Sequence, residues 1–163
     1  MFELKPISRE AIPRALEKAE RYRLLNEPKE AESICLDILL VDPGNQQALI
    51  TLLLALTDQF DAGSQITRPR EILPKLSGEY ERAYYGGIIY ERKARAQLNA
   101  AFPGAGSMAY QGFREAMGWY EKAEAIRPPG NDDAELRWNA CARTIMEHHL
   151  APRQEDTVHL MLE

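Results

Sequence analysis

Histidine and cysteine are the side chains of this chain that could bind a metal ion or act as a nucleophile. The histidines are His148, His149 and His159, and the cysteines are Cys35 and Cys141. Adjacent residues of a helix point to different faces, so His148 and His149 are not placed to share a metal ion. The sequence holds no His-Glu-x-x-His, Glu-x-x-His or Cys-x-x-Cys spacing, and these are spacings that zinc and di-iron sites use. We therefore expect no metal site.

Motifs of phosphate binding and of acyl transfer are also missing. Neither a Gly-x-x-x-x-Gly-Lys phosphate loop nor a Gly-x-Ser-x-Gly elbow is present. Gly86 and Gly87 fall inside a predicted helix, where glycine allows a second helix to approach closely. Acidic residues are frequent on helix faces that we expect to be solvated. The sequence therefore predicts a protein that is not an enzyme and that binds no cofactor.

The composition is typical of an ordinary folded domain. With 163 residues, of which 45% are hydrophobic and 28% charged, the chain can bury a core as one domain and is neither disordered nor fibrous. Its formal net charge of -5 argues against nucleic acid or an anionic membrane surface as the partner, because both attract clustered Lys and Arg. A protein partner stays open.

Three further features predict a cytoplasmic protein. Residues 1–6 have no apolar run behind their single lysine, unlike a signal peptide. The longest apolar stretch, residues 48–56, is less than half of the roughly 20 residues that a membrane span needs. Cys35 and Cys141 fall at core-like positions of different helices, where each is expected to be a small buried hydrophobe and not half of a disulfide. Reduced thiols suit the cytoplasm.

Apolar spacing and capping residues predict helices along most of the chain. The expected helices cover residues 9–25, 28–41, 46–60, 79–99, 107–126 and 132–149, with a short helix near 70–76. Asn45 and Ser107 are the expected caps of two of them, and Pro152 is expected to end the last. Residues 91–99 and 108–115 favour helix, so we expect the helices on either side of the turn at 101–106 to be lengthened into a projecting hairpin.

Three stretches of the chain align on a spacing of 34 residues, the repeat length of a helix-turn-helix solenoid unit. Most equivalent positions hold similar residues, and the columns are Ala19, Leu53 and Gly87, then Tyr22, Leu56 and Tyr90, then Ala31, Gln65 and Ala116, then Ile38, Ile72 and Ala123. Gln65 departs from the small residue of its column. Pro43 and Pro128 follow the second helix of their units, where proline stops a helix. These columns resemble the tetratricopeptide repeat family.

The resemblance implies that residues 1–150 form one domain. Its repeat units are residues 12–45, 46–79 and 80–130, the last with an insertion, and a capping helix follows at 131–149. Residues 151–163 form a C-terminal tail. The resemblance implies an all-α, right-handed superhelix of about three helix pairs plus the capping helix. Pro69 and Pro74 fall inside the second helix of the second unit, so that helix should be short or broken. The phrases at residues 81–87 and 128–133 also resemble a little-described group of bacterial tetratricopeptide proteins.

The family's geometry implies that the first helix of each unit lines a concave groove. The candidate contacts to a partner are the residues at inward or bordering positions: Leu16, Glu20, Arg23, Ile50, Leu54, Tyr84, Ile88, Glu91, Arg92, Asn139 and Arg143. This groove should be apolar in the middle and acidic toward the cap, which favours a peptide with apolar anchors and some positive charge.

One known specificity of the family is not expected. Its carboxylate clamp grips the acidic tails of chaperones through Lys and Asn at the fifth and ninth positions of the opening helix. Here Leu16 and Glu20 occupy those positions. The chain should therefore not be a chaperone-tail receptor.

Two functions stay open at this point. The first is a non-catalytic adaptor or scaffold that binds a protein or peptide partner, of unknown identity, in the groove. The alternative is a self-associating structural module, in the simplest case a homodimer, whose groove is filled by its own tail or by a second copy. In the tail, Val158, Leu160 and Leu162 alternate and give an extended segment one apolar edge. Leu16, Ile50 and Leu54 could equally be core residues under the N-terminal arm or the tail.

Overall fold

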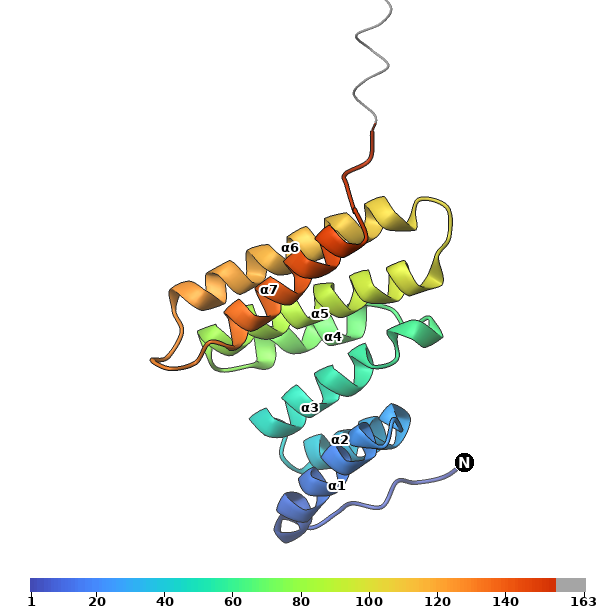
Figure 1. Cartoon of the computed structure of the whole chain (residues 1–163). Coiled ribbons are helices and arrows are strands. Elements are labelled where there is room, and N and C mark those ends of the chain that lie inside the picture. The colour runs from blue at the N-terminus through green and yellow to red at the C-terminus, as the bar shows by residue number, and fades with distance from the viewer. Residues whose placement is uncertain (155–163) are drawn as a thin grey trace, which may run out of the picture.

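The computed structural model describes residues 1–154, and the regular structure in that part of the chain is helical, without strands. This confirms the all-α class. The α-helices are α1 Ile12–Leu24, α2 Pro28–Val41, α3 Gln46–Thr57, α4 Thr67–Ile72, α5 Glu79–Ala100, α6 Ala105–Ala125 and α7 Asp133–Glu147 (Figure 1). Short 3-10 helices lie at Arg9–Ala11, Phe60–Ala62 and Leu73–Lys75. The predicted docking of the tail falls on residues 155–163, outside the described residues.

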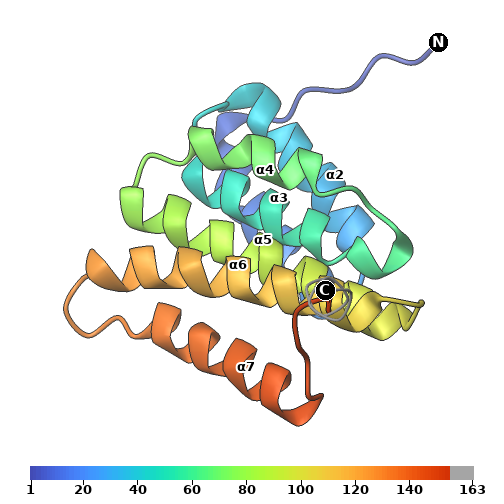
Figure 2. The same cartoon turned by 90° about the horizontal axis from the view of Figure 1, so that it is seen from above.

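Consecutive helices form pairs, and the pairs are stacked in the order in which they occur in the chain. α1 packs on α2, α3 on α4, and α5 on α6, while α7 packs on α6 (Figures 1 and 2). Neighbouring pairs meet through α2 and α3, and through α1, α3 and α5. Stacking the pairs buries the apolar residues of the helices against one another.

Local sequence sets several of the boundaries as predicted. The Asn45 side chain accepts a hydrogen bond from the Ala48 N–H at 2.9 Å and so caps α3. Asn26 has a φ of 59°, which lets the chain turn between α1 and α2, and Pro28 starts α2. The first N–H groups of a helix have no partner within the helix. Asn45 accepts from one of them in α3, and Pro28 has no N–H at the start of α2.

Several predicted boundaries are wrong. α4 begins at Thr67 and not near Arg70, and it ends at Ile72. Ser107 is not a cap, because Gly104 with its φ of 82° already starts α6 at Ala105, and the Ser107 hydroxyl donates to the Gly104 carbonyl at 3.0 Å. α3 ends at Thr57 and not at Phe60. α7 ends at Glu147, with His149 at a φ of 51°, so the helix stops before Pro152.

The unequal lengths of the helices follow the predictions. α4 has 6 residues, with Pro69 in its first turn and Pro74 in the 3-10 helix that follows. α5 has 22 residues and α6 has 21, against 13 and 14 in α1 and α2. The α5–α6 hairpin therefore extends beyond its neighbours.

Two large apolar clusters hold the pairs together. One is built around α3 with Leu53 and Ile89, and the other around α6 with Phe113 and Tyr120, all at 0% exposure. Cys35 and Cys141 are buried as predicted, and burial raises the pKa of each thiol to about 12. Within residues 1–154, no helix combines the length and the apolar character needed to cross a membrane.

Candidate functional site

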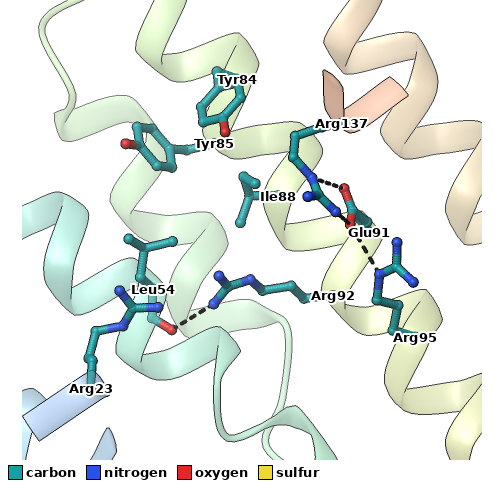
Figure 3. A pocket seen from close by; sticks show the side chains of 9 residues that line it. All are labelled: Arg23, Leu54, Tyr84, Tyr85, Ile88, Glu91, Arg92, Arg95 and Arg137. Atoms are coloured by element: carbon teal, nitrogen blue, oxygen red, sulfur yellow. Dashed lines mark hydrogen bonds and ion pairs between the residues drawn. The ribbon is translucent and has the colours of Figure 1, made fainter. Parts of the chain in front are cut away.

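A pocket of about 480 Å³ opens where α1, α3, α5 and α7 face one another, and we call it the inner pocket (Figure 3). Its lining consists of Arg23, Leu54, Tyr84, Tyr85, Ile88, Glu91, Arg92, Arg95 and Arg137. α5 supplies six of these residues, at spacings of three and four that bring side chains to one side of a helix. The other helices contribute one residue each.

Glu91 is the buried charge at one side of the pocket. Its side chain is only 4% exposed, and it accepts hydrogen bonds from the Tyr120 hydroxyl at 2.9 Å and from Arg95 Nε at 3.1 Å. Arg137 binds it with two nitrogens, Nε at 3.1 Å and Nη2. Burial acts to raise the pKa of the Glu91 carboxyl, but the bonds and charge of Arg137, with help from Tyr120 and Arg95, outweigh it and lower the pKa. Glu91 is therefore ionised at neutral pH.

A second carboxylate organises the other side. Asp58, just after α3, accepts bonds from Arg23 Nε at 2.8 Å and Arg23 Nη2 at 3.3 Å, and from Arg92 Nη1 at 2.5 Å. Arg92 Nη1 also donates to the Thr57 hydroxyl at 2.9 Å and to the Leu54 carbonyl at 3.3 Å. Each of the two carboxylates thus holds two arginines in place.

Apolar and aromatic side chains line the pocket beside these two groups (Figure 3). Tyr84 and Tyr85 meet edge to face at 5.0 Å between ring centroids, and Figure 3 shows Ile88 lying between the tyrosines and the arginines. Burial, followed by the charge of Asp133, raises the pKa of Tyr84 to about 12, so its phenol keeps its proton at neutral pH. We call Leu54, Tyr84, Tyr85 and Ile88 the apolar centre.

The inner pocket brings together more than half of the predicted contacts. The residues that line it as predicted are Arg23, Leu54, Tyr84, Ile88, Glu91 and Arg92. Sequence reasoning missed Tyr85, Arg95 and Arg137. Tyr85 and Arg95 lie on α5 beside residues that were predicted as contacts. A prediction that included a broader face of this helix would have found both. No local signal marked Arg137.

The other predicted contacts lie elsewhere. Leu16 is 8% exposed and packs with Ile12, Ile38 and Ala48, and Ile50 packs against the cluster around α3. Glu20 and Arg143 are exposed on α1 and α7 without lining the inner pocket. Asn139 lines a separate pocket with Trp138 and three glutamates.

The expectation of an acidic groove toward the cap is wrong for the inner pocket. α7 buries its face with Ala134, Cys141 and Thr144 against the neighbouring helices. In this orientation of α7 about its axis, Arg137 and not Glu135 lines the pocket. The lining therefore contains four arginines and one glutamate. This composition weighs against the positively charged peptide that the sequence favoured.

Within residues 1–154, His, Cys, Asp and Glu side chains form no group of three that could hold a metal ion. The inner pocket combines arginine donors held by carboxylates with an apolar centre. We compared the chain with known proteins, and no protein-family model, no curated protein and no solved structure matches it.

Proposed function

We propose that this chain is a non-catalytic adaptor of the tetratricopeptide repeat type, which binds a peptide segment of a partner protein in the inner pocket. The stacked helix pairs and the 34-residue columns support the repeat type. The observation that carries the binding function is the inner pocket itself: it is lined by the first helix of each pair and by the last helix, α7.

The chemistry of the lining favours recognition over catalysis. Glu91 is held by hydrogen bonds from three side chains and stays ionised, so it is poorly suited to exchange a proton at neutral pH. Tyr84 and Tyr85 keep their protons. Aromatic residues and arginine are the residue types that dominate the energetics of protein interfaces.

A matched pair of tyrosine variants tests this proposal. Tyr84→Ala should reduce capture of the partner at least about tenfold, because it removes a large contact from the apolar centre. Tyr90→Ala is the control, since Tyr90 is half-buried on the same helix but lies outside the inner pocket.

The measurement is affinity capture from the producing cells with mass spectrometry, and far-ultraviolet circular dichroism checks that both variants are helical. A folded Tyr84→Ala variant that captures the same proteins as the wild type would refute the pocket as the binding site. Loss of capture in both variants would point to general destabilisation and would also count against the assignment.

A further inference from the structure

We infer that the segment bound in the inner pocket is acidic: an extended peptide that places an apolar side chain between two Asp or Glu side chains. This inference rests on the proposed function and adds the chemistry of the partner. It comes from one arrangement in Figure 3, in which arginines stand on two sides of the apolar centre. Arg23 and Arg92 both bind Asp58, and we call them the Asp58 pair. Arg95 and Arg137 both bind Glu91, and we call them the Glu91 pair.

The first argument is the balance of charge. Four guanidinium groups share Glu91 and Asp58, an excess of two positive charges among these six side chains, while Asp133 and Glu81 act on the tyrosine side of the pocket. Arginine stays charged at any physiological pH. The whole chain has a net charge of -5, so this excess is local to the pocket. An anionic side chain bound there would gain Coulomb energy that a neutral or basic one would not.

The second argument is the set of donors that remains. A guanidinium has five N–H groups, and each arginine here keeps one terminal nitrogen that makes no hydrogen bond to residues 1–154. Those nitrogens are Arg23 Nη1, Arg92 Nη2, Arg95 Nη2 and Arg137 Nη1. The side chains are 21 to 37% exposed, so a ligand can reach them. The two buried carboxylates orient the arginines in advance, which lowers the entropy cost of binding.

The third argument is the shape of the lining. Ile88 lies beside both pairs, with the tyrosines on its far side (Figure 3), so a ligand that reaches both pairs passes over an apolar surface. Alternate side chains of an extended peptide point to the same side, and a sequence such as Glu-x-Leu-x-Glu places Leu on this surface between two acidic side chains. Each pair already binds one carboxylate through arginine nitrogens, which shows that carboxylate geometry suits these donors.

This recognition differs from a clamp for a chain end. Both acidic groups are side chains in the interior of the peptide, so a free C-terminal carboxylate is not required. Leu16 and Glu20, which occupy the positions of the family's clamp, do not line the inner pocket.

Selection from a random peptide library displayed in the interior of a carrier protein tests the inference without a known partner. The purified chain should enrich peptides with two acidic residues around Leu, Ile, Phe or Tyr. The best peptide is then made with blocked ends, and a matched peptide carries Gln in place of both acidic residues. We expect the Gln peptide to bind at least about tenfold more weakly by fluorescence anisotropy.

Variants of the protein give the second readout. Arg137→Gln and Arg92→Gln should each weaken the acidic peptide about tenfold, whereas Arg114→Gln, on the exposed face of α6, should leave its affinity unchanged. For the wild-type protein, raising salt from about 50 to about 500 mM should also weaken binding severalfold. The salt series keeps the test valid if an arginine variant fails to fold.

The outcomes separate the two levels of proposal. The selection could instead yield peptides without acidic residues that bind the wild type but not Tyr84→Ala. That result would overturn the inference of an acidic segment and leave the proposed function standing. Selection that yields no peptide sensitive to Tyr84→Ala would count against both. Equal affinity for the acidic and Gln peptides, or affinity independent of salt, would also overturn the inference.

Discussion

Glu91 shows how one buried side chain can prepare a binding surface without touching the ligand. Tyr120 binds it from the core side, and Arg95 and Arg137 bind it from the pocket side. An isolated buried carboxylate would be strongly destabilising, so these partners are needed for the fold as well as for the pocket. The same contacts make the free energy of unfolding depend on pH.

We predict that Glu91→Gln lowers the free energy of unfolding by about 2 to 3 kcal/mol at pH 7, because it removes charged hydrogen bonds to partly exposed arginines and to Tyr120. The folded state lowers the pKa of Glu91, so its stabilising effect is complete above the unfolded-state pKa near 4.3 and is lost as the pH falls through the folded-state value. The difference between wild type and variant should therefore shrink toward pH 3.

Urea unfolding of both proteins at pH 7 and pH 3 measures this difference. Glu115→Gln is the control, since Glu115 is exposed on α6, and it should change stability by less than about 0.5 kcal/mol. A Glu91→Gln effect of the same size at both pH values would contradict the linkage.

At the scale of elements, the close approach of α5 and α6 depends on two glycines. A Cβ at Gly87 would lie 2.3 Å from the Tyr120 ring, and a Cβ at Gly86 would lie 2.6 Å from the Trp119 ring. Helical glycine costs about 1 kcal/mol relative to alanine. The helix tolerates that cost because the missing side chains let the aromatic rings pack directly on the α5 backbone.

We predict that Gly87→Ala destabilises the protein by about 2 kcal/mol or more, because the clash with buried Tyr120 exceeds the gain in helix propensity. Gly118→Ala in α6 is the matched control: a Cβ there meets nothing within 4 Å, so this variant should gain up to about 1 kcal/mol. Thermal unfolding of both variants measures the two shifts. A stabilising Gly87→Ala would show that α5 and α6 are not held as closely as described.

At the scale of the whole molecule, charge is distributed unevenly. The chain is acidic overall, with 25 Asp and Glu against 20 Lys and Arg, yet the inner pocket gathers four arginines. We expect the acidic remainder of the surface to repel polyanions such as nucleic acid. A partner with a short acidic segment on an otherwise uncharged or basic surface would suit both regions.

Self-association stays a prediction at this scale. A chain that fills the pocket with its own tail or with a second copy should change in stability or in mass when residues 156–163 are deleted. Sedimentation over a range of concentrations, together with urea unfolding, measures both properties. Unchanged stability and an unchanged mass after the deletion would discard the tail as an occupant.

The sequence by itself determined the helices and most of their ends, because caps, prolines and apolar spacing act between residues close in the chain. It indicated Asn45 as a cap, α4 as a short helix and α5 as a lengthened one, and it placed Tyr84, Ile88, Glu91 and Arg92 on one face. Only the tertiary structure decided the charge of the pocket. Arg23 and Asp58 lie 35 positions apart in the chain, and Arg137 and Glu91 lie 46 apart. Such pairs depend on how each helix rotates about its axis when it packs, and that rotation is fixed by the combined fit of many buried side chains.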